Sequence, residues 1–195
     1  DADRVAPVNK DVVNNCGSMY DRFQSFVDDQ FTESGNAYGV PIRFGWYGYS
    51  YDSRSVPDHE PSYDILFEPD YVDADLDGEI IMYDEAAKSI PAAALYLGMD
   101  DAMSGARMTF TEEQLTEIQD LLIEQKPRLQ GYIAPDPTFI QEFRQGNFLV
   151  GQSGRNETVQ MRSEGDDWVE YVAHQEGALA WYETAVVSAA SDNQE

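Results

Sequence analysis

The chain has 195 residues, with 37 acidic side chains against 12 basic ones and a formal net charge of -25. This length suits one compact domain or two small ones, and a hydrophobic share of 42% argues against disorder. The negative charge excludes nucleic acid and an anionic membrane surface as partners, because both are bound through basic side chains. No run approaches the roughly 18 apolar residues that a membrane-spanning helix needs.

The first four residues are not followed by an apolar segment, so we expect no signal peptide and either a cytoplasmic or a processed protein. Cys16 is the single cysteine, which excludes an internal disulfide. Only three lysines are present, Lys10, Lys88 and Lys126. An Asp- and Glu-rich surface with few lysines suits concentrated salt, which screens its self-repulsion. We therefore expect a halophilic source and an acidic surface.

In the first half of the chain, segments with the apolar periodicity of a helix alternate with segments typical of a strand. The predicted elements are an amphipathic helix over 17–30, an extended aromatic run over 37–51, a loop over 52–61, a helical turn over 63–67, a buried strand over 79–83 and a helix over 84–97. Pro91 lies inside that last helix, which is therefore expected to be kinked or to begin near Ser89. Gly98 is a suitable residue to end it.

The second half continues the alternation. Residues 111–114 (TEEQ) match a capping box at the start of an apolar helical stripe. The predicted elements that follow are a short helix over 137–145, a strand over 148–150, a helix over 154–164, a strand over 168–172 and a strand over 178–187. The runs 79–83 and 148–150, apolar apart from Glu79, are expected to be interior strands of one sheet. Strands that alternate with helices indicate the α/β class.

Residues 73–84 have the spacing of a calcium loop, with Asp73, Asp75, Asp77 and Asp84 at positions 1, 3, 5 and 12. A proline precedes this run and a strand follows it, so both helices of an EF-hand are missing. We favour an acidic surface turn and expect no metal, with a calcium-stabilised surface module as an alternative.

Three carboxylates stand at or near predicted strands: Asp84 and Glu85 after the strand 79–83, and Glu183 on the last strand. Ligands bind at such edges in open α/β sheets, and paired carboxylates hold cations or perform acid–base chemistry. A helix cap by Asp84, with Glu85 favoured by the helix dipole, explains two of them equally well. A hydrolase built on these three residues is a less favoured alternative, because no activated nucleophile accompanies them.

Other motifs carry little chemistry. His59 and His174 have no partners at the spacing of a zinc site, and phosphate-loop, dinucleotide and nucleophile-elbow motifs are missing. We therefore expect no cofactor and no catalysis. One cluster of aromatic residues forms either core or a box for a cation or a planar ligand. Its members are Phe44, Trp46, Tyr47, Tyr49 and Tyr51.

Four segments, in this order, resemble extracellular solute-binding proteins of ABC importers, and most closely the spermidine/putrescine-binding branch. They are residues 38–51, 62–71, 78–85 and 176–184. The resemblance runs from about Val8 to Glu195 and implies two α/β lobes around a cleft. Since a complete member is far longer, the chain resembles a truncated one.

The fold that this implies is α/β, with a type-II periplasmic-binding-protein-like lobe whose mixed sheet is flanked by helices, plus stubs of the first lobe. Residues 1–45 would be the remnant of lobe 1 and a crossing strand, 46–177 lobe 2, and 178–195 the return strand into lobe 1.

The resemblance also implies ligand contacts. Trp181 matches a tryptophan that packs on the ligand's aliphatic chain, Glu183 stands where an aspartate holds an ammonium, and Glu85 matches a second acidic contact. Lys88 stands where polyamine binders carry a glutamate, and Gln152 where they carry a tryptophan. Together with Phe44, these are the candidate ligand-binding residues. Glu85 and Lys88 are three residues apart, so on a helix they share a face and can pair with each other.

The implied function is capture of a small cationic or zwitterionic, polyamine-like solute at the extracellular face of the cell membrane. The implied partner is an ABC permease that recognises the closed, liganded state. Contact with the membrane itself would come only through a missing anchor or through the permease.

Overall fold

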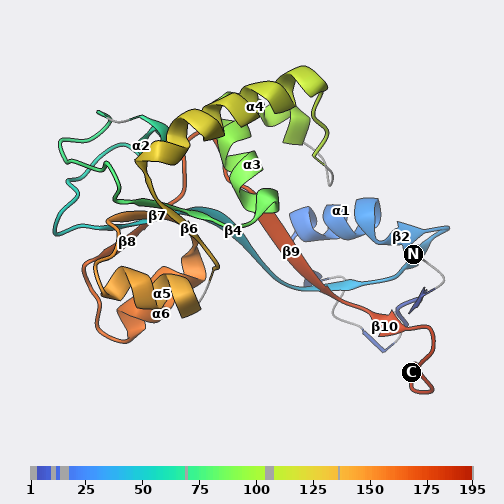
Figure 1. Cartoon of the computed structure of the whole chain (residues 1–195). Coiled ribbons are helices and arrows are strands. Elements are labelled where there is room, and N and C mark those ends of the chain that lie inside the picture. Colours follow the sequence, from blue (N-terminus) through green and yellow to red (C-terminus); the bar gives the residue numbers. More distant parts are fainter. Residues whose placement is uncertain are drawn as a thin grey trace. The chain divides into compact units, whose positions relative to one another are not determined.

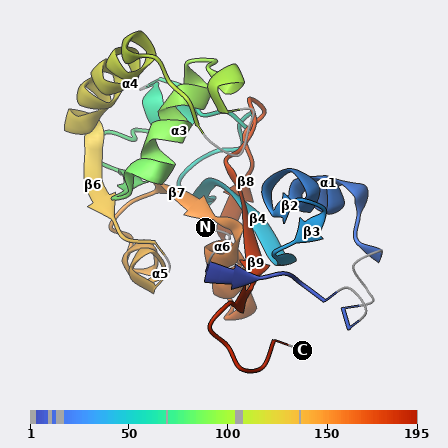
Figure 2. The same ribbon diagram turned by 90° about the vertical axis from the view of Figure 1, so that its right-hand side faces the viewer.

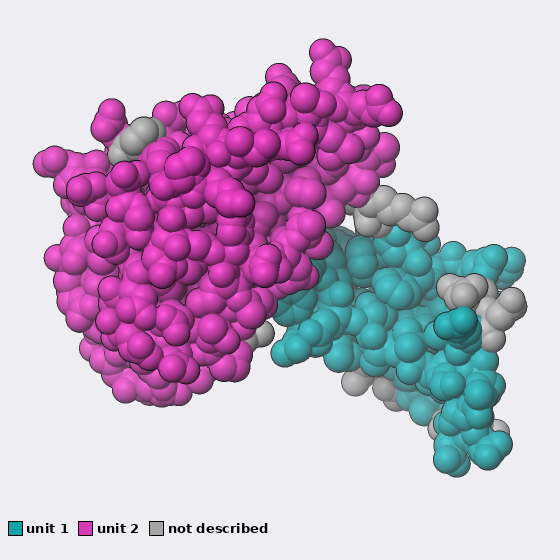
Figure 3. Space-filling model, in the orientation of Figure 1, with its two compact units in different colours: residues 1–45, 181–195 teal, residues 46–180 magenta. Residues whose placement is uncertain are grey.

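The computed structural model describes residues 4–9, 12–13, 18–68, 70–103, 108–135 and 137–194. It divides into two compact units, coloured in Figure 3. Unit 1 comprises Asp1–Gly45 and Trp181–Glu195, and unit 2 comprises Trp46–Ala180. The chain passes between the units within two strands, β4 (Val40–Asp52) and β9 (Ala180–Ala185).

Unit 1 is built around one helix and the unit's portions of those two strands, which pair with each other. Its other elements are β1 (Val5–Ala6), α1 (Asp21–Gln30), β2 (Thr32–Glu33), β3 (Asn36–Ala37) and β10 (Val187–Ser188). Aromatic rings join the helix to the strands: Phe23 contacts Phe44, and Phe26 stacks on Tyr182 with ring centroids 4.1 Å apart. The helix expected over 17–30 is present from Asp21, and residue 17 lies outside the described residues.

Unit 2 contains a mixed sheet in the strand order β6-β5-β7-β4-β8. The new strands are β5 (Ile80–Tyr83), β6 (Leu129–Ile133), β7 (Val150–Gly154) and β8 (Val169–Val172). β5 is parallel to β6 and β7, whereas β4 is antiparallel to β7 and β8. The expected α/β class with a mixed sheet is therefore confirmed.

Helices cover both faces of this sheet (Figures 1 and 2). They are α2 (Asp64–Phe67), α3 (Ala86–Tyr96), α4 (Glu112–Gln125), α5 (Pro137–Arg144) and α6 (Arg155–Ser163), with 3-10 turns at Asp100–Met103 and Lys126–Arg128. Side chains alternate along β5: Ile80 and Met82 join the core under α3 and α4, and Ile81 and Tyr83 join the core under α5 and α6. All four residues of β5 are buried, as the apolar run predicts.

One boundary prediction is wrong, and the helix expected over 84–97 does not take its alternative start near Ser89. The strand expected over 148–150 begins only at Val150, and Phe148 is buried in the loop before it. The helix after β5 begins at Ala86 and runs through Pro91 rather than starting near Ser89. Its N-cap residue is Glu85, not Asp84, and no side chain caps it; instead the Ser89 hydroxyl donates to the Tyr83 carbonyl at 2.7 Å.

The part of the calcium-like run before β5, residues 73–79, is a loop in which Asp73, Asp75 and Asp77 are exposed and Leu76 is buried. The Asp77 amide donates to the Asp75 carboxylate at 3.2 Å, and Arg128 lies 3.7 Å from the Asp77 carboxylate. Among the described residues, no three His, Cys, Asp or Glu side chains lie close enough together to hold a metal ion. Within the same residues, no helix combines the length and apolar character needed to cross a membrane.

Candidate ligand-binding residues

In unit 2, Lys88 lies in the first turn of α3, directly after the buried strand β5. Its ammonium is 2.6 Å from the Glu85 carboxylate and lies over the rings of Tyr47 and Tyr83, 4.9 and 4.8 Å from their centroids. The two rings are nearly perpendicular, at 85°. Only 11% of the Lys88 side chain is exposed. The ammonium is therefore enclosed by two aromatic faces and one carboxylate, each of which attracts a cation.

The charge of Lys88 survives this burial. Desolvation favours the neutral amine, but the hydrogen bond and charge of Glu85 and the contact with Tyr47 outweigh it, so the pKa of Lys88 is raised above its usual value. Burial also raises the pKa of the Tyr47 phenol, although Lys88 opposes this. At neutral pH the group is thus an ammonium beside two neutral phenols.

Hydrogen bonds fix the groups behind this ammonium. The Tyr83 hydroxyl donates to Glu157 at 2.6 Å and accepts from the Gly154 amide at 3.0 Å. The buried Gln152 side chain accepts from the Tyr83 amide at 3.2 Å and donates to the Lys88 carbonyl at 3.0 Å. Gln152 therefore ties β7 to the end of β5 and the start of α3.

In unit 1, Trp181 and Glu183 lie two residues apart on β9, and Arg43 and Gly45 lie two residues apart on β4. The Trp181 indole lies against Gly45, where an added Cβ would come within 2.6 Å of the ring. Arg43 forms a two-point ion pair with Glu183, with Nη2 2.5 Å from Oε1. Its guanidinium carbon is 5.8 Å from the Trp181 ring centroid. Unit 1 thus presents an indole, a cation and an anion together.

The Arg43–Glu183 pair is open to solvent, with 67% and 41% of the side chains exposed. The hydrogen bond from Arg43 holds the pKa of Glu183 below its usual value. Phe44, between Arg43 and Gly45 in the chain, is half-exposed and packs on Phe23 with ring centroids 4.7 Å apart. It belongs to the aromatic cluster of α1 rather than to the indole side of the strand.

The candidate residues therefore form two groups, each within one unit. Glu85, Lys88 and Gln152 meet in unit 2, and Trp181 and Glu183 meet in unit 1. Sequence reasoning missed Arg43 and the roles of Tyr47 and Tyr83. A signal for Arg43 existed, since residues two apart on paired strands share a face.

Both histidines pack against tyrosine rings of unit 2. His59 lies 2.7 Å from the Tyr49 hydroxyl. His174 is buried and stacks on Tyr63, with ring centroids 3.3 Å apart. Neither ring nitrogen of His174 has a hydrogen-bond partner within the described part of the chain, and burial lowers the pKa of His174 to about 3. Tyr49 and Tyr51 are likewise buried in the core.

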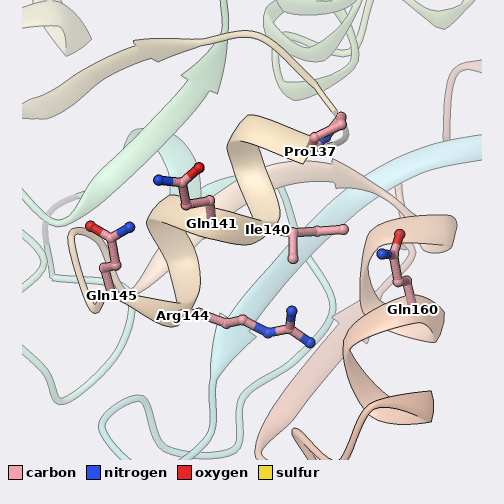
Figure 4. A pocket seen from close by; sticks show the side chains of 6 residues that line it. All are labelled: Pro137, Ile140, Gln141, Arg144, Gln145 and Gln160. Carbon is pink, nitrogen blue, oxygen red and sulfur yellow. The ribbon is translucent and has the colours of Figure 1, made fainter.

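A hollow of about 610 Å³ lies between α5 and α6, away from the candidate residues. In Figure 4, Ile140 and Arg144 of α5 point toward Gln160 of α6. Its lining residues are Pro137, Ile140, Gln141, Arg144, Gln145 and Gln160. Arg144 pairs with Glu164 at 2.7 Å and with Asp166 at 2.6 Å, so its charge is already balanced. This hollow offers no concentrated charge to a solute.

A family model described as bacterial extracellular solute-binding protein matches residues 1–195, the whole chain. The chain belongs to this family.

Solved structures share its fold. The spermidine/putrescine ABC transporter substrate-binding protein PotD from Streptococcus pneumoniae is 20% identical, with a TM-score of 0.78, over 98% of this chain and 54% of that one. The Tp0655 (TpPotD) lipoprotein of Treponema pallidum is 17% identical, with a TM-score of 0.75, over 98% and 56%. The Atu4243-GABA receptor is 16% identical, with a TM-score of 0.69, over 98% and 52%. The chain thus spans about half the length of these proteins.

Proposed function

We propose that this chain captures a small solute at the extracellular face of the cell membrane and delivers it to the permease of an ABC importer, without catalysis. Family membership over the whole chain supports this role. A solute-binding protein works by closing on its ligand, and the permease distinguishes the closed state from the open one. Glu85 and Glu183 support binding better than hydrolysis, because each is paired with a cation rather than with a nucleophile or a water-activating base.

We further propose that the solute is zwitterionic, with an ammonium at one end and a carboxylate at the other. One observation carries this: both acidic residues expected to hold ammonium groups have a basic partner, Arg43 for Glu183 and Lys88 for Glu85. Each of these carboxylates is therefore already neutralised, and neither favours a dication over a zwitterion. A zwitterion can use Glu183 for its ammonium and Arg43 for its carboxylate, with the Trp181 indole against its methylenes.

The descriptions of proteins with a similar fold name both a polyamine and an amino acid. One is described as a spermidine/putrescine substrate-binding protein and another as a GABA receptor. The pairing of Glu183 with Arg43 makes the second kind of solute, an ω-amino acid, the better candidate for this chain.

A thermal-shift screen tests the role, with 4-aminobutyrate, 5-aminovalerate, glycine betaine, putrescine and spermidine as ligands. We expect saturable stabilisation by at least one ω-amino acid, which Glu183→Gln weakens by about tenfold or more in affinity, as losing one charge-assisted contact implies. The matched control is Glu33→Gln, which removes an exposed carboxylate of the same unit. If no solute stabilises the protein, or if Glu33→Gln has the same effect as Glu183→Gln, the proposed site is wrong.

A further inference from the structure

Tyr47, Tyr83 and Glu85 together form what we call the ammonium enclosure. Two ring faces at right angles and one carboxylate are the groups with which proteins bind an alkylammonium ligand. In this structure the enclosure holds the ammonium of Lys88, 2.6 Å from the carboxylate and less than 5 Å from both ring centroids.

The enclosure is preorganised by residues other than Lys88. Tyr83 is fixed through its hydroxyl by Glu157 and the Gly154 amide. The Gln152 amide fixes the backbone on both sides of Glu85, at Tyr83 and at Lys88. These contacts fix Tyr83 and the backbone around Glu85 without the Lys88 side chain.

The occupant is well desolvated, unlike a lysine of a surface ion pair. Its side chain is 11% exposed, and Glu85, at 46%, is the more open partner. A helical i, i+3 pair on a surface is worth only a few tenths of a kcal/mol and leaves both charges in water. Lys88 instead directs its ammonium onto the aromatic faces.

We propose that the ammonium enclosure is an alkylammonium site that the chain fills itself, with Lys88 as a tethered occupant. Removing the Lys88 side chain would open the site to a free primary amine. The consequence for specificity rests on the proposed function: the ammonium of a solute cannot enter the filled enclosure. The site itself can be tested without any transported solute.

The test is chemical rescue of Lys88→Ala by n-propylammonium, which restores the three carbons and the nitrogen that alanine lacks. We expect a saturable rise of the melting temperature of Lys88→Ala with n-propylammonium chloride, beyond that with equal sodium chloride. The wild type and Lys88→Met, which refills the space without a charge, should show no such rise. n-Propanol, of similar shape but uncharged, should not replace the amine. Adding Glu85→Gln to Lys88→Ala should weaken the rescue by tenfold or more.

A folded Lys88→Ala variant that responds to n-propylammonium no more than the wild type does would overturn the proposal. The unmodified protein offers a second measurement, should that variant fail to fold. With three lysines in the chain, ¹³C-lysine labelling gives a simple NMR spectrum. The side-chain methylene protons of Lys88, assigned with Lys88→Arg, should lie upfield of those of Lys126 because of the two rings. Coincident shifts would contradict the enclosure.

A third arm separates the site from the transport role. It is the binding of 4-aminobutyrate and putrescine to the wild type. Rescue by n-propylammonium together with no solute binding in the wild type would leave the site standing and remove the proposed function. Solute binding without rescue would do the reverse.

Discussion

Two ion pairs among the candidate residues have the same charges but differ in the exposure of the cation. Lys88 and Glu85 in unit 2 meet against two tyrosine faces, with the lysine side chain 11% exposed. Arg43 and Glu183 in unit 1 meet in the open, with 67% and 41% of their side chains exposed. The two carboxylates are similarly exposed, at 46% for Glu85 and 41% for Glu183, so the pairs differ in the cation: Lys88 is desolvated by its neighbours, whereas Arg43 exchanges readily with water and ions. The charges of Arg43 and Glu183 are therefore accessible from solvent, whereas the ammonium of Lys88 is largely shielded from it.

The largest effect we expect is that of salt on the melting temperature, because salt screens the repulsion between exposed charges. A net charge of -25 repels itself in dilute buffer, and molar salt reduces the Debye length to about 3 Å. We expect the melting temperature to rise by about 10 °C between dilute buffer and 2 M NaCl, or about 3 kcal/mol for a chain of this size. Scanning calorimetry at both salt concentrations measures it. Equal melting temperatures would refute the expected halophilic character.

Charge reversal compares the two pairs directly. Lys88→Glu places a carboxylate beside Glu85 in a poorly solvated position, and we expect a loss of about 3 kcal/mol in the free energy of unfolding. The matched change Arg43→Glu should cost at most about 1 kcal/mol, because water solvates both carboxylates there. Urea unfolding of the two variants gives the difference. Equal losses would mean that Lys88 is no more buried than Arg43.

His174 is a buried base whose pKa is shifted in the opposite direction to that of Lys88. The pKa of His174 is lowered to about 3 by burial, while the unfolded chain takes up the same proton near pH 6.5. Acid therefore favours unfolding: stability is complete above pH 6.5 and falls toward pH 3 by about 1.4 kcal/mol per pH unit.

The variant His174→Phe should lack this component. The free energy of unfolding of the variant minus that of the wild type should therefore be about 2 kcal/mol larger at pH 5 than at pH 7.5. Urea midpoints at both pH values measure this. A difference that does not change with pH would contradict the buried, neutral histidine.

The smallest expected effect concerns the indole of unit 1. Gly45→Ala would place a methyl 2.6 Å from the Trp181 ring and displace it. We expect solute affinity to fall about tenfold, or about 1.4 kcal/mol, with little change in unfolding. Gly131→Ala is the matched control, because its added Cβ meets no atom within 4 Å. Unchanged affinity in Gly45→Ala would remove Trp181 from the binding surface.

Local signals in the sequence predicted much of the fold. The capping box at Thr111 and Gln114 is formed as expected, and the apolar run 79–83 became the buried β5. β7 was misplaced because buried strands are expected to be apolar. Its residues Gln152 and Ser153 are polar, yet they lie inside the sheet because main-chain and hydroxyl partners satisfy them.

The candidate site was only partly predictable. Glu85 and Lys88 pair as their i, i+3 spacing predicts. The partner of Glu183 is 140 residues away, and only strand pairing brings Arg43 beside it. Likewise the sequence left Tyr47, one of five aromatic residues, between a place in the core and a place in a ligand box, and its contact with Lys88 depends on the tertiary fold.

Isothermal titration calorimetry with 4-aminobutyrate and putrescine tests the central claim most directly. The two ligands have four carbons and one ammonium in common and differ in whether the other end is a carboxylate or a second ammonium. If Arg43 and Glu183 hold the two ends of the solute, 4-aminobutyrate should bind at least tenfold more tightly, or about 1.4 kcal/mol. Putrescine binding as tight or tighter, and surviving Glu183→Ala, would contradict the account.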